Sequence, residues 1–345
     1  MCRHVCPVGH VTARETFTPH AWALAVESVR RGQLAWNDET AAVMYACADC
    51  GLCRTHCVTD QPLPDAIVSA RADIVRAGKS PAAVVEYGRM FESSMASAGA
   101  FTASPSADRV LFVGAAAGSA AEEVAAALQL LEAAGLPAVT AGETWPTGLT
   151  ASTLGLVDLA THAARDLVSA VAASGVSEVL VLGPTDKWTF EYVYPTRLGV
   201  AWPTGVAIRE VTMALAEAYD DGRLSLSRRD DPPPAYHDPC HGPRLSRDAA
   251  APRRLLAAIH GDRPAPELFW RAGRAHPCGA IGGLDLTHPD LARQLTLARI
   301  DDARSTGAAA FVTDDPACLV ELRRHAGDGM AAAGLYSLLR GQLRT

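Results

Sequence analysis

The stretch that decides the organisation of this chain is Cys47-Ala48-Asp49-Cys50-Gly51-Leu52-Cys53-Arg54-Thr55-His56-Cys57, where four cysteines follow the spacing C-x2-C-x2-C-x3-C. Three thiolates at this spacing can surround one iron–sulfur cluster, and the fourth can ligate a second cluster. Disulfides suit such close spacing poorly, and structural zinc usually takes two C-x2-C pairs across a longer gap. The run therefore predicts iron–sulfur ligation.

A second cysteine element lies near the N-terminus, where Cys2-Arg3-His4-Val5-Cys6-Pro7 reads C-x3-C-P, the back half of the same motif. Two such elements form a ferredoxin-type module, in which the last cysteine of each element ligates the cluster of the other. The first 4Fe–4S cluster is therefore expected on four cysteines: Cys6, Cys47, Cys50 and Cys53. A second cluster is expected on Cys2 and Cys57, with two ligands absent from this sequence.

The missing ligands bear on the start of the chain. A complete first element would read C-x2-C-x-Met-C-x3-C-P, which places Met1 inside the motif. We expect the natural protein to begin upstream of Met1 and to supply the two cysteines there. The alternative is a one-cluster protein in which Cys2 and Cys57 are free or bind a labile metal.

Composition narrows the class of protein. The chain has 345 residues, a formal net charge of −7 and 49% hydrophobic residues. This acidic balance excludes the basic footprint of a nucleic-acid-binding protein. No apolar run reaches the roughly 18 residues of a transmembrane helix. Nine cysteines in a chain with metal-ligand motifs indicate a protein of a reducing compartment, where thiols stay free to bind metal. We expect a cytoplasmic protein, at most peripheral to the inner membrane face.

Four segments are expected along the chain: a ferredoxin-type module at 1–92, a linker at 93–108, and α/β domains at 109–230 and 231–345. Pro19 to Tyr45 carries a helical pattern that predicts two helices between the cysteine elements. After the linker, short apolar strands alternate with amphipathic helices, which predicts parallel βαβ units. The expected fold class is α+β, with a mostly helical first module.

The two α/β domains align on their turns, which suggests an internal duplication. The aligned pairs are Ala115 with Cys240, Thr147-Gly148 with Cys278-Gly279, and Asp186 with Cys318. The gaps between these markers are 32 and 39 residues in the first domain and 38 and 40 in the second. We expect the cysteine site to be present only in the second copy.

With these motifs the chain resembles the iron–sulfur subunits of glycolate oxidase, anaerobic glycerol-3-phosphate dehydrogenase and the heterodisulfide reductases. In that family a ferredoxin-type module precedes two cysteine-rich (CCG) domains that read C…CCG…C-x-x-C. The resemblance covers nearly the whole chain, and His237-Asp238-Pro239-Cys240-His241 matches the family's first-cysteine loop closely. It implies two CCG-like α/β domains with cysteine sites.

This chain departs from the family pattern at several ligand positions. In the second copy, Pro277 replaces the first cysteine of the pair and Asp315 replaces the first cysteine of C-x-x-C. In the first copy the replaced positions are Ala115, Pro146-Thr147, Gly183 and Asp186. Three thiols remain in the second copy, on Cys240, Cys278 and Cys318, and the fourth ligand would be Asp315, His241 or His237.

The metal at this C-terminal site is expected to be a further iron–sulfur cluster, with zinc as the alternative. The competing interpretation is that Cys240, Cys278 and Cys318 are buried cysteines without a metal, because free cysteine is commonly buried. The glycine-rich stretch Gly279 to Gly283 follows a cysteine rather than a strand, so it is not a dinucleotide site.

The expected function is electron transfer by a non-catalytic subunit of an oxidoreductase complex. No flavin-binding motif is present, so the resemblance implies a partner flavin-dependent dehydrogenase that oxidises the substrate. Electrons would then pass to a quinone or a soluble carrier. Two alternatives stay open: a thiol–disulfide catalytic subunit like the heterodisulfide reductases, and a docking or assembly protein with structural clusters.

Overall fold

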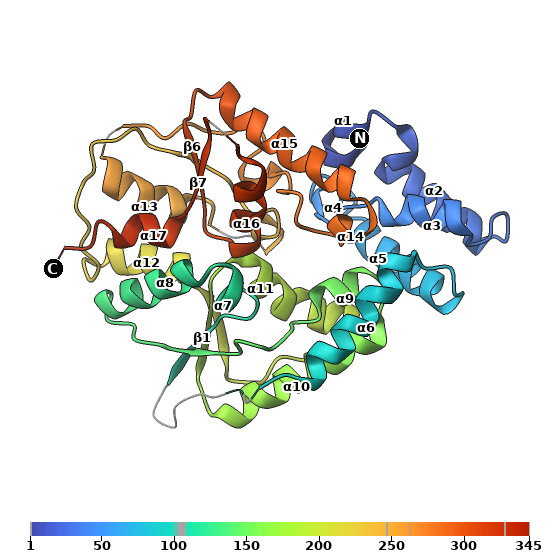
Figure 1. The fold of residues 1–345 in the computed structure, drawn as a ribbon, viewed down its shortest axis with the longest axis horizontal. Helices are drawn as coiled ribbons and strands as arrows, with labels where there is room; N and C mark the ends of the chain where they lie inside the picture. The colour runs from blue at the N-terminus through green and yellow to red at the C-terminus, as the bar shows by residue number, and fades with distance from the viewer. Residues whose placement is uncertain are drawn as a thin grey trace.

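The computed structural model describes residues 2–99, 101, 108–245, 248–261, 263–327 and 329–344. A helical part, coloured blue to cyan, lies beside two α/β parts (Figure 1). This mixed architecture confirms the predicted fold class. Met1, on which the prediction about the natural N-terminus depends, lies outside the described residues. Among the described helices, none combines the length and the apolar character needed to cross a lipid bilayer.

The helical part corresponds to the predicted ferredoxin-type module. Its elements are η1 (Cys2–Val5), α1 (Pro7–Thr12), η2 (Glu15–Phe17), α2 (Pro19–Arg30), α3 (Asp38–Tyr45), α4 (Leu52–Thr55), α5 (Leu63–Arg76) and α6 (Ala82–Ala96). The predicted pair of helices between the cysteine elements is present as α2 and α3. Proline occupies the first turn of α2, and the Asn37 side chain accepts the Thr40 N–H at 2.9 Å to cap α3.

The first α/β part follows the predicted alternation of strands and helices. Its elements are β1 (Arg109–Phe112), α7 (Ala116–Ser119), α8 (Ala121–Ala133), β2 (Val139–Ala141), α9 (Leu149–Thr153), α10 (Val157–Ser174), β3 (Glu178–Val181), α11 (Pro184–Trp188), the π-helix η3 (Thr189–Leu198), β4 (Ala207–Glu210) and α12 (Val211–Asp220). The predicted linker is shorter than expected at its start, because α6 continues to Ala96. Residues 100 and 102–107 of that linker lie outside the described residues.

The second α/β part contains the C-terminal cysteines. Its elements are β5 (Ala235–Tyr236), η4 (Gly242–Leu245), α13 (Ala250–His260), η5 (Ala272–Arg274), α14 (Leu284–Thr287), α15 (Pro289–Ser305), β6 (Ala310–Thr313), α16 (Pro316–His325), β7 (Ala331–Gly334) and α17 (Leu335–Arg340).

Both sheets are parallel. The first has the order β2-β1-β3-β4 and the second the order β5-β6-β7. In the first, Val110 pairs with Val139 on one side and Val179 on the other. In the second, Val312 pairs with Tyr236 and with Ala333. The order β1-β3-β4 in the first sheet resembles β5-β6-β7 in the second, because in both cases the strands lie side by side in the order of the chain. This likeness supports the predicted duplication, which stays a prediction.

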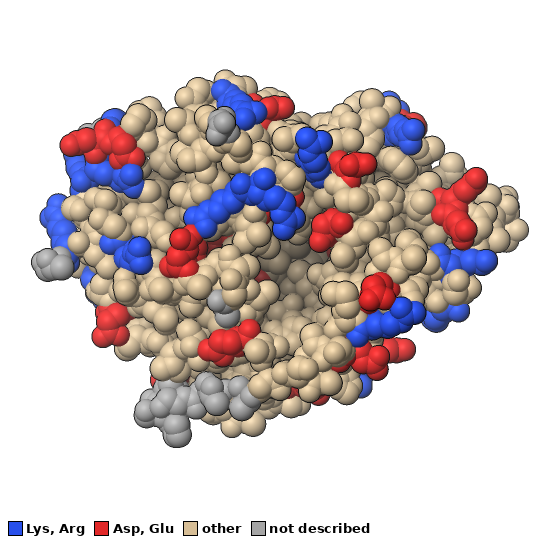
Figure 2. Space-filling model, viewed as in Figure 1, with Lys and Arg blue, Asp and Glu red and all other residues tan. Residues whose placement is uncertain are grey.

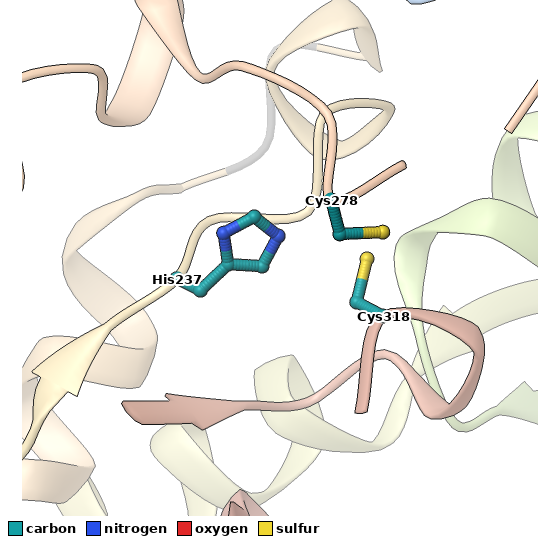
Figure 3. Close-up of side chains that lie close together, drawn as sticks. All are labelled: His237, Cys278 and Cys318. Carbon is teal, nitrogen blue, oxygen red and sulfur yellow. The ribbon is translucent and has the colours of Figure 1, made fainter. Parts of the chain in front are cut away.

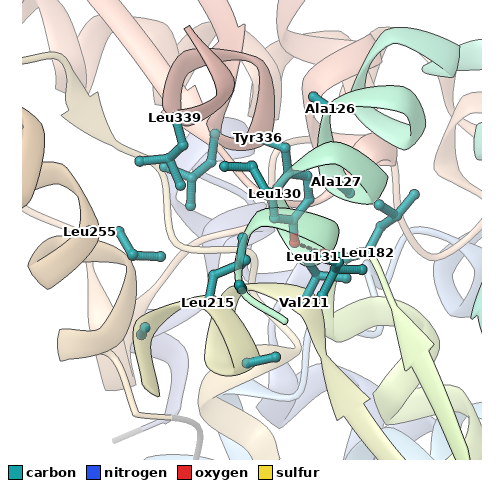
Figure 4. Close-up of a cluster of buried hydrophobic side chains, with 14 of the residues drawn as sticks. Ala126, Ala127, Leu130, Leu131, Leu182, Val211, Leu215, Leu255, Tyr336 and Leu339 are labelled. Atoms are coloured by element: carbon teal, nitrogen blue, oxygen red, sulfur yellow. Dashed lines mark hydrogen bonds between the residues drawn. The ribbon is translucent and has the colours of Figure 1, made fainter. Parts of the chain in front are cut away.

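One hydrophobic core joins the two α/β parts. Leu130 and Leu215 from the first part and Leu255 and Tyr336 from the second belong to the same buried cluster (Figure 4). The Tyr336 hydroxyl donates to the carbonyl oxygen of Leu182 across this boundary. Because apolar area buried between the parts is removed from water, the two parts support each other's folding.

A separate core joins the helical part to the second α/β part. Cys6, Cys47 and Cys50 are buried in it together with Cys240 and Leu291 of the C-terminal part. Cysteines of two distant sequence motifs therefore share one water-excluded environment. This packing places the ferredoxin-type cysteines against the C-terminal cysteine site.

Candidate metal centres

The first candidate centre lies in the turn between α3 and α4, beside the start of α1. Asp49 and Gly51 adopt left-handed backbone conformations, with φ of 48° and 72°, which bend the chain between Cys47 and Cys53. The thiol of Cys6 caps α1 and accepts the Gly9 N–H at 3.5 Å. Cys47 Sγ accepts the Asp49 N–H at 3.4 Å. Such N–H···S bonds tune cluster potentials.

The four predicted ligands are brought together by the fold. Burial raises the pKa of the Cys53 thiol, and the neighbouring Cys47, Cys50 and Cys6 raise it further. Burial likewise raises the pKa of Cys47 to about 12. Buried thiols at this density stay protonated unless a cation compensates the thiolates, and the thiolate is the form that binds metal. The set therefore fits an iron–sulfur cluster, whose irons supply that positive charge.

A buried arginine adds to this fit. Arg71 on α5 is 0% exposed and donates to the carbonyl oxygens of Cys47 at 2.6 Å and Met44 at 2.9 Å. Its hydrogen bonds within the described residues all go to main-chain carbonyls, whereas the nearby Asp49 carboxylate is paired with Arg197 at 2.7 Å. An otherwise uncompensated guanidinium suits an anionic cluster at the Cys47 loop.

Sequence reasoning missed Arg71, although a signal was available. On the helix at 63–76 the buried positions include Ile67 and Ile74, and Arg71 lies on the same apolar face. A charge at such a position is rarely buried without a partner. The sequence pattern therefore marked Arg71 as unusual, but only the fold shows which groups surround it.

The predicted ligands of the second cluster border one cavity. Cys2 and Cys57, both half-buried, line a cavity of about 600 Å³ that Cys53 also borders. The thiol of Cys57 lies 3.2 Å from the Thr59 hydroxyl, and this hydrogen bond lowers the pKa of Cys57. Two thiols supply half of the ligands that a 4Fe–4S cluster takes. A second cluster on Cys2 and Cys57 stays a prediction.

The C-terminal candidate centre is formed by His237, Cys278 and Cys318. One ligand atom from each lies within 4.8 Å of the others, and all three residues are buried. Figure 3 shows the two sulfurs facing each other, with the imidazole of His237 beside them. Of the three candidates for the fourth ligand of this site, His237 is therefore the one brought to the Cys278 and Cys318 thiols.

Local structure explains this convergence. His237 directly follows β5, and its N–H donates to the Val312 carbonyl of β6 at 2.8 Å, which extends the sheet. Cys318 lies in the first turn of α16, just after β6 ends. Because parallel strands end at the same edge, their following loops meet there. Gly279 permits the approach of the Cys278 loop to α15, since a Cβ would lie 2.6 Å from the Ala292 carbonyl oxygen.

His237 is electrostatically suited to binding a metal. The side chain is 0% exposed, and neither ring nitrogen has a hydrogen-bond partner in the described structure. Burial, together with the nearby charge of Arg299, lowers the pKa of His237 to about 3. The imidazole is therefore neutral at physiological pH, which is the form that ligates metals.

The other two predicted fourth ligands make different contacts. The Asp315 carboxylate caps α16 by accepting the N–H groups of Ala317 at 3.1 Å and Cys318 at 3.2 Å. Its second oxygen accepts the Thr185 N–H at 3.3 Å. The His241 ring stacks on Trp188 with a centroid distance of 4.0 Å. Both residues nevertheless border the cysteine site.

Cys240 lies between the two centres. Burial raises the pKa of its thiol, and Cys50 raises it more than any other charged neighbour. Arg244 connects the same pair, because its Nε donates to the Cys50 carbonyl at 2.8 Å and its charge lowers the pKa of both thiols. Arg244 was not singled out from sequence, since arginines are frequent along this chain and none of its neighbours marks it.

A cavity of about 330 Å³ opens beside the C-terminal centre. Cys240, Cys278 and Cys318 all line it, as do Asp285 and Arg324. Figure 2 shows a hollow on this face, where α6, α9, α14 and α16 meet. The cysteine site therefore borders a cavity large enough for a small molecule.

Two of the replaced positions of the predicted first copy, Gly183 and Asp186, lie beside Asp315 of the second. A Cβ on Gly183 would lie 2.8 Å from the Asp315 carboxylate, so the two loops that replace C-x-x-C pack against each other. Burial, together with the neighbouring Asp315, raises the pKa of Asp186 to about 7. The first copy thus supplies a wall of the C-terminal site.

Comparison with known proteins agrees with this architecture. Residues 234–323 match the family model described as "Cysteine-rich domain", CCG. The chain is 26% identical over 311 residues to one of the subunits of the dihydromethanophenazine:CoB–CoM heterodisulfide reductase of Methanosarcina barkeri, covering 84% of this chain and 73% of that protein. It is 30% identical over 87 residues to the lactate utilization protein of Shouchella clausii, covering 25% of this chain and 35% of that protein.

A solved structure shares the fold. The crystal structure of a hypothetical protein from Helicobacter pylori matches with a TM-score of 0.54 at 9% identity, covering 89% of this chain and 64% of that one. The cysteine run, the helical module and the cysteine-rich domain together define an iron–sulfur subunit associated with an oxidoreductase. Residues 234–323 thus match the cysteine-rich CCG domain, and the similarity over most of the chain supports a CCG-domain iron–sulfur subunit.

Proposed function

We propose that this chain is the electron-transfer subunit of a multisubunit oxidoreductase. A partner flavin-dependent dehydrogenase oxidises the substrate, and its electrons enter the 4Fe–4S cluster held by four thiolates: Cys6, Cys47, Cys50 and Cys53. They leave toward Cys240 and the adjoining cavity, where a quinone or a soluble carrier is reduced. Homology to a heterodisulfide reductase subunit supports membership of a complex.

The observation that carries this proposal is the contact between the two cysteine sites. Cys50 and Cys240 share one buried core, and Arg244 reaches from the Cys240 side to the Cys50 carbonyl at 2.8 Å. An electron that reaches Cys50 is therefore already beside the C-terminal site. No large movement of the chain is needed between the two.

The residues around the cluster set the polarity and the charge along this electron-transfer path. When bound, the cluster supplies one-electron transfer. The core around Cys6, Cys47 and Cys50 excludes water, which keeps the local dielectric low. Arg71 and the N–H groups of Gly9 and Asp49 place positive charge or dipoles near the sulfurs, which favours the reduced state.

The test uses the protein purified without oxygen. We expect iron and acid-labile sulfide in the wild type, and an electron paramagnetic resonance signal after reduction. Cys50→Ser should lose or change this signal, whereas His56→Ala, at an exposed position of the same run, should keep it. Reduction of the wild type by a flavin dehydrogenase and its substrate tests the partner. Colourless protein without sulfide would refute the proposal.

A second candidate is supported by the cavity. A volume of about 330 Å³ bordered by Cys240, Cys278 and Cys318 can admit a small disulfide. Thiol–disulfide reduction at this site would make the chain a catalytic subunit. Turnover of a mixed disulfide with a reduced viologen as electron donor distinguishes the two, because a pure electron-transfer subunit shows none.

A further inference from the structure

We propose that His237, Cys278 and Cys318 bind a single thiophilic divalent ion, zinc or ferrous iron, and not a cubane cluster. The fourth coordination position of this ion faces the cavity. The inference goes beyond the proposed function, because it holds whether or not electrons reach the C-terminal site.

The spacing of the ligand atoms carries the argument. Around one tetrahedral ion, with bonds of about 2.3 Å to sulfur and 2.0 Å to nitrogen, ligand atoms stand roughly 3.5–4 Å apart. The ligand atoms of His237, Cys278 and Cys318 lie within 4.8 Å of one another, so a small inward shift of the side chains brings them to this spacing. In a cube each thiolate binds a different iron, so the sulfurs must stand farther apart.

The ferredoxin-type cysteines provide an internal comparison. Cys6, Cys47, Cys50 and Cys53 are close enough to raise one another's pKa. Over the part of the chain that the structure describes, they form no group as tight as that of His237, Cys278 and Cys318. The same fold thus contains one wide set of four thiols and one tight set of two thiols and an imidazole.

His237 has no other partner that explains its position. It is fully buried, and both ring nitrogens lack a hydrogen-bond partner within the described residues. Buried polar groups are nearly always paired, because an unpaired one loses its water without compensation. A metal bond to one nitrogen removes this cost. Asp315 is a poor rival ligand, since its oxygens already accept three main-chain N–H groups.

The fourth position follows from the cavity. Cys278 and Cys318 line it, whereas His237 lies behind them and does not. An ion held between the two sulfurs therefore borders the cavity on its open side. Two cysteines and one histidine with an open fourth position form the ligand pattern of a catalytic zinc site. Cys240 also lines this cavity but does not belong to the close group of three ligand atoms.

The experiment measures metals in the whole protein, with its ferredoxin-type cluster in place. We expect one zinc per chain, or one iron per chain in excess of acid-labile sulfide, and X-ray absorption showing sulfur and nitrogen around one metal. His237→Ala should lower this ion at least tenfold after mild chelation, while leaving sulfide unchanged. His237→Cys should retain it, which separates ligation from a purely structural role.

His260→Ala is the matched control, because His260 is also buried with both ring nitrogens unpartnered in the described structure. It lies on α13, outside the cysteine site, and should keep the ion. Two results would overturn the inference. One is full retention of the ion in His237→Ala. The other is loss of both iron and sulfide from the C-terminal site in Cys318→Ser, which would indicate a cluster there.

Discussion

Replacing Arg71 with methionine is the most informative single perturbation of the ferredoxin-type centre. The guanidinium donates to four carbonyl groups, those of Met44, Cys47, Thr153 and Gly282, at distances from 2.6 to 3.2 Å. These acceptors belong to all three parts of the chain. Arg71 therefore both joins the parts and supplies a positive charge beside the Cys47 loop.

The electrostatic role of Arg71 and its role in joining the parts of the chain affect two different measured quantities. At a separation of about 8 Å and an effective dielectric near 20, one charge changes the energy of a transferred electron by about 2 kcal/mol, or on the order of 90 mV. Arg71→Met should lower the cluster midpoint potential by roughly this amount. Leaving the four buried carbonyl groups without a donor should also lower the free energy of unfolding by roughly 3–5 kcal/mol.

The assay is a redox titration of anaerobic protein followed by electron paramagnetic resonance, with chemical denaturation alongside. Arg71→Lys is the matched control, because it keeps the charge but loses the fork that reaches several carbonyls. Lysine should therefore lower stability while leaving the potential near that of the wild type. A folded Arg71→Met protein with unchanged potential, or an equal shift in Arg71→Lys, would show that this charge does not act on the cluster.

Two further predictions test other parts of the molecule. Burial raises the pKa of Glu123, so its stabilising contribution is complete below the ordinary glutamate range and is lost as pH rises through the raised value. Glu123→Gln, which cannot ionise, should gain stability over the wild type as pH rises above the ordinary glutamate pKa of about 4.3 in denaturation titrations; a difference that stays constant with pH would contradict this. Cys57→Ser should keep the resonance signal of the first cluster, whereas Cys53→Ser should lose it. Loss of that signal in Cys57→Ser would show that the two ligand sets are assigned wrongly.

Much of the first centre could be predicted from sequence, because its determinants are local. Cys47, Cys50 and Cys53 lie within seven residues, so covalent spacing alone limits how they can point. The alternation of strand and helix was equally readable, since apolar periodicity reflects the side of each element that is buried. The motif also predicted that Cys6 lies near these three cysteines, and in the fold it is their neighbour.

The fourth ligand of the C-terminal site, in contrast, could not be chosen from the sequence, because contacts between distant segments decide it. His237, His241 and Asp315 were equal candidates by sequence, because all three flank cysteines. Pairing of β5 with β6 directs His237 toward Cys278 and Cys318, while the start of α16 engages Asp315 and the ring of Trp188 covers His241.

The sequence by itself determined the cysteine chemistry and the order of secondary structure, because both depend on neighbours along the chain. The tertiary structure alone decided that Arg71 is buried among carbonyl groups, that Cys50 and Cys240 share one buried core, and that the two α/β parts share another. Those contacts join residues far apart in sequence. Their energies come from packing and from a low dielectric, which exist only once the chain has folded.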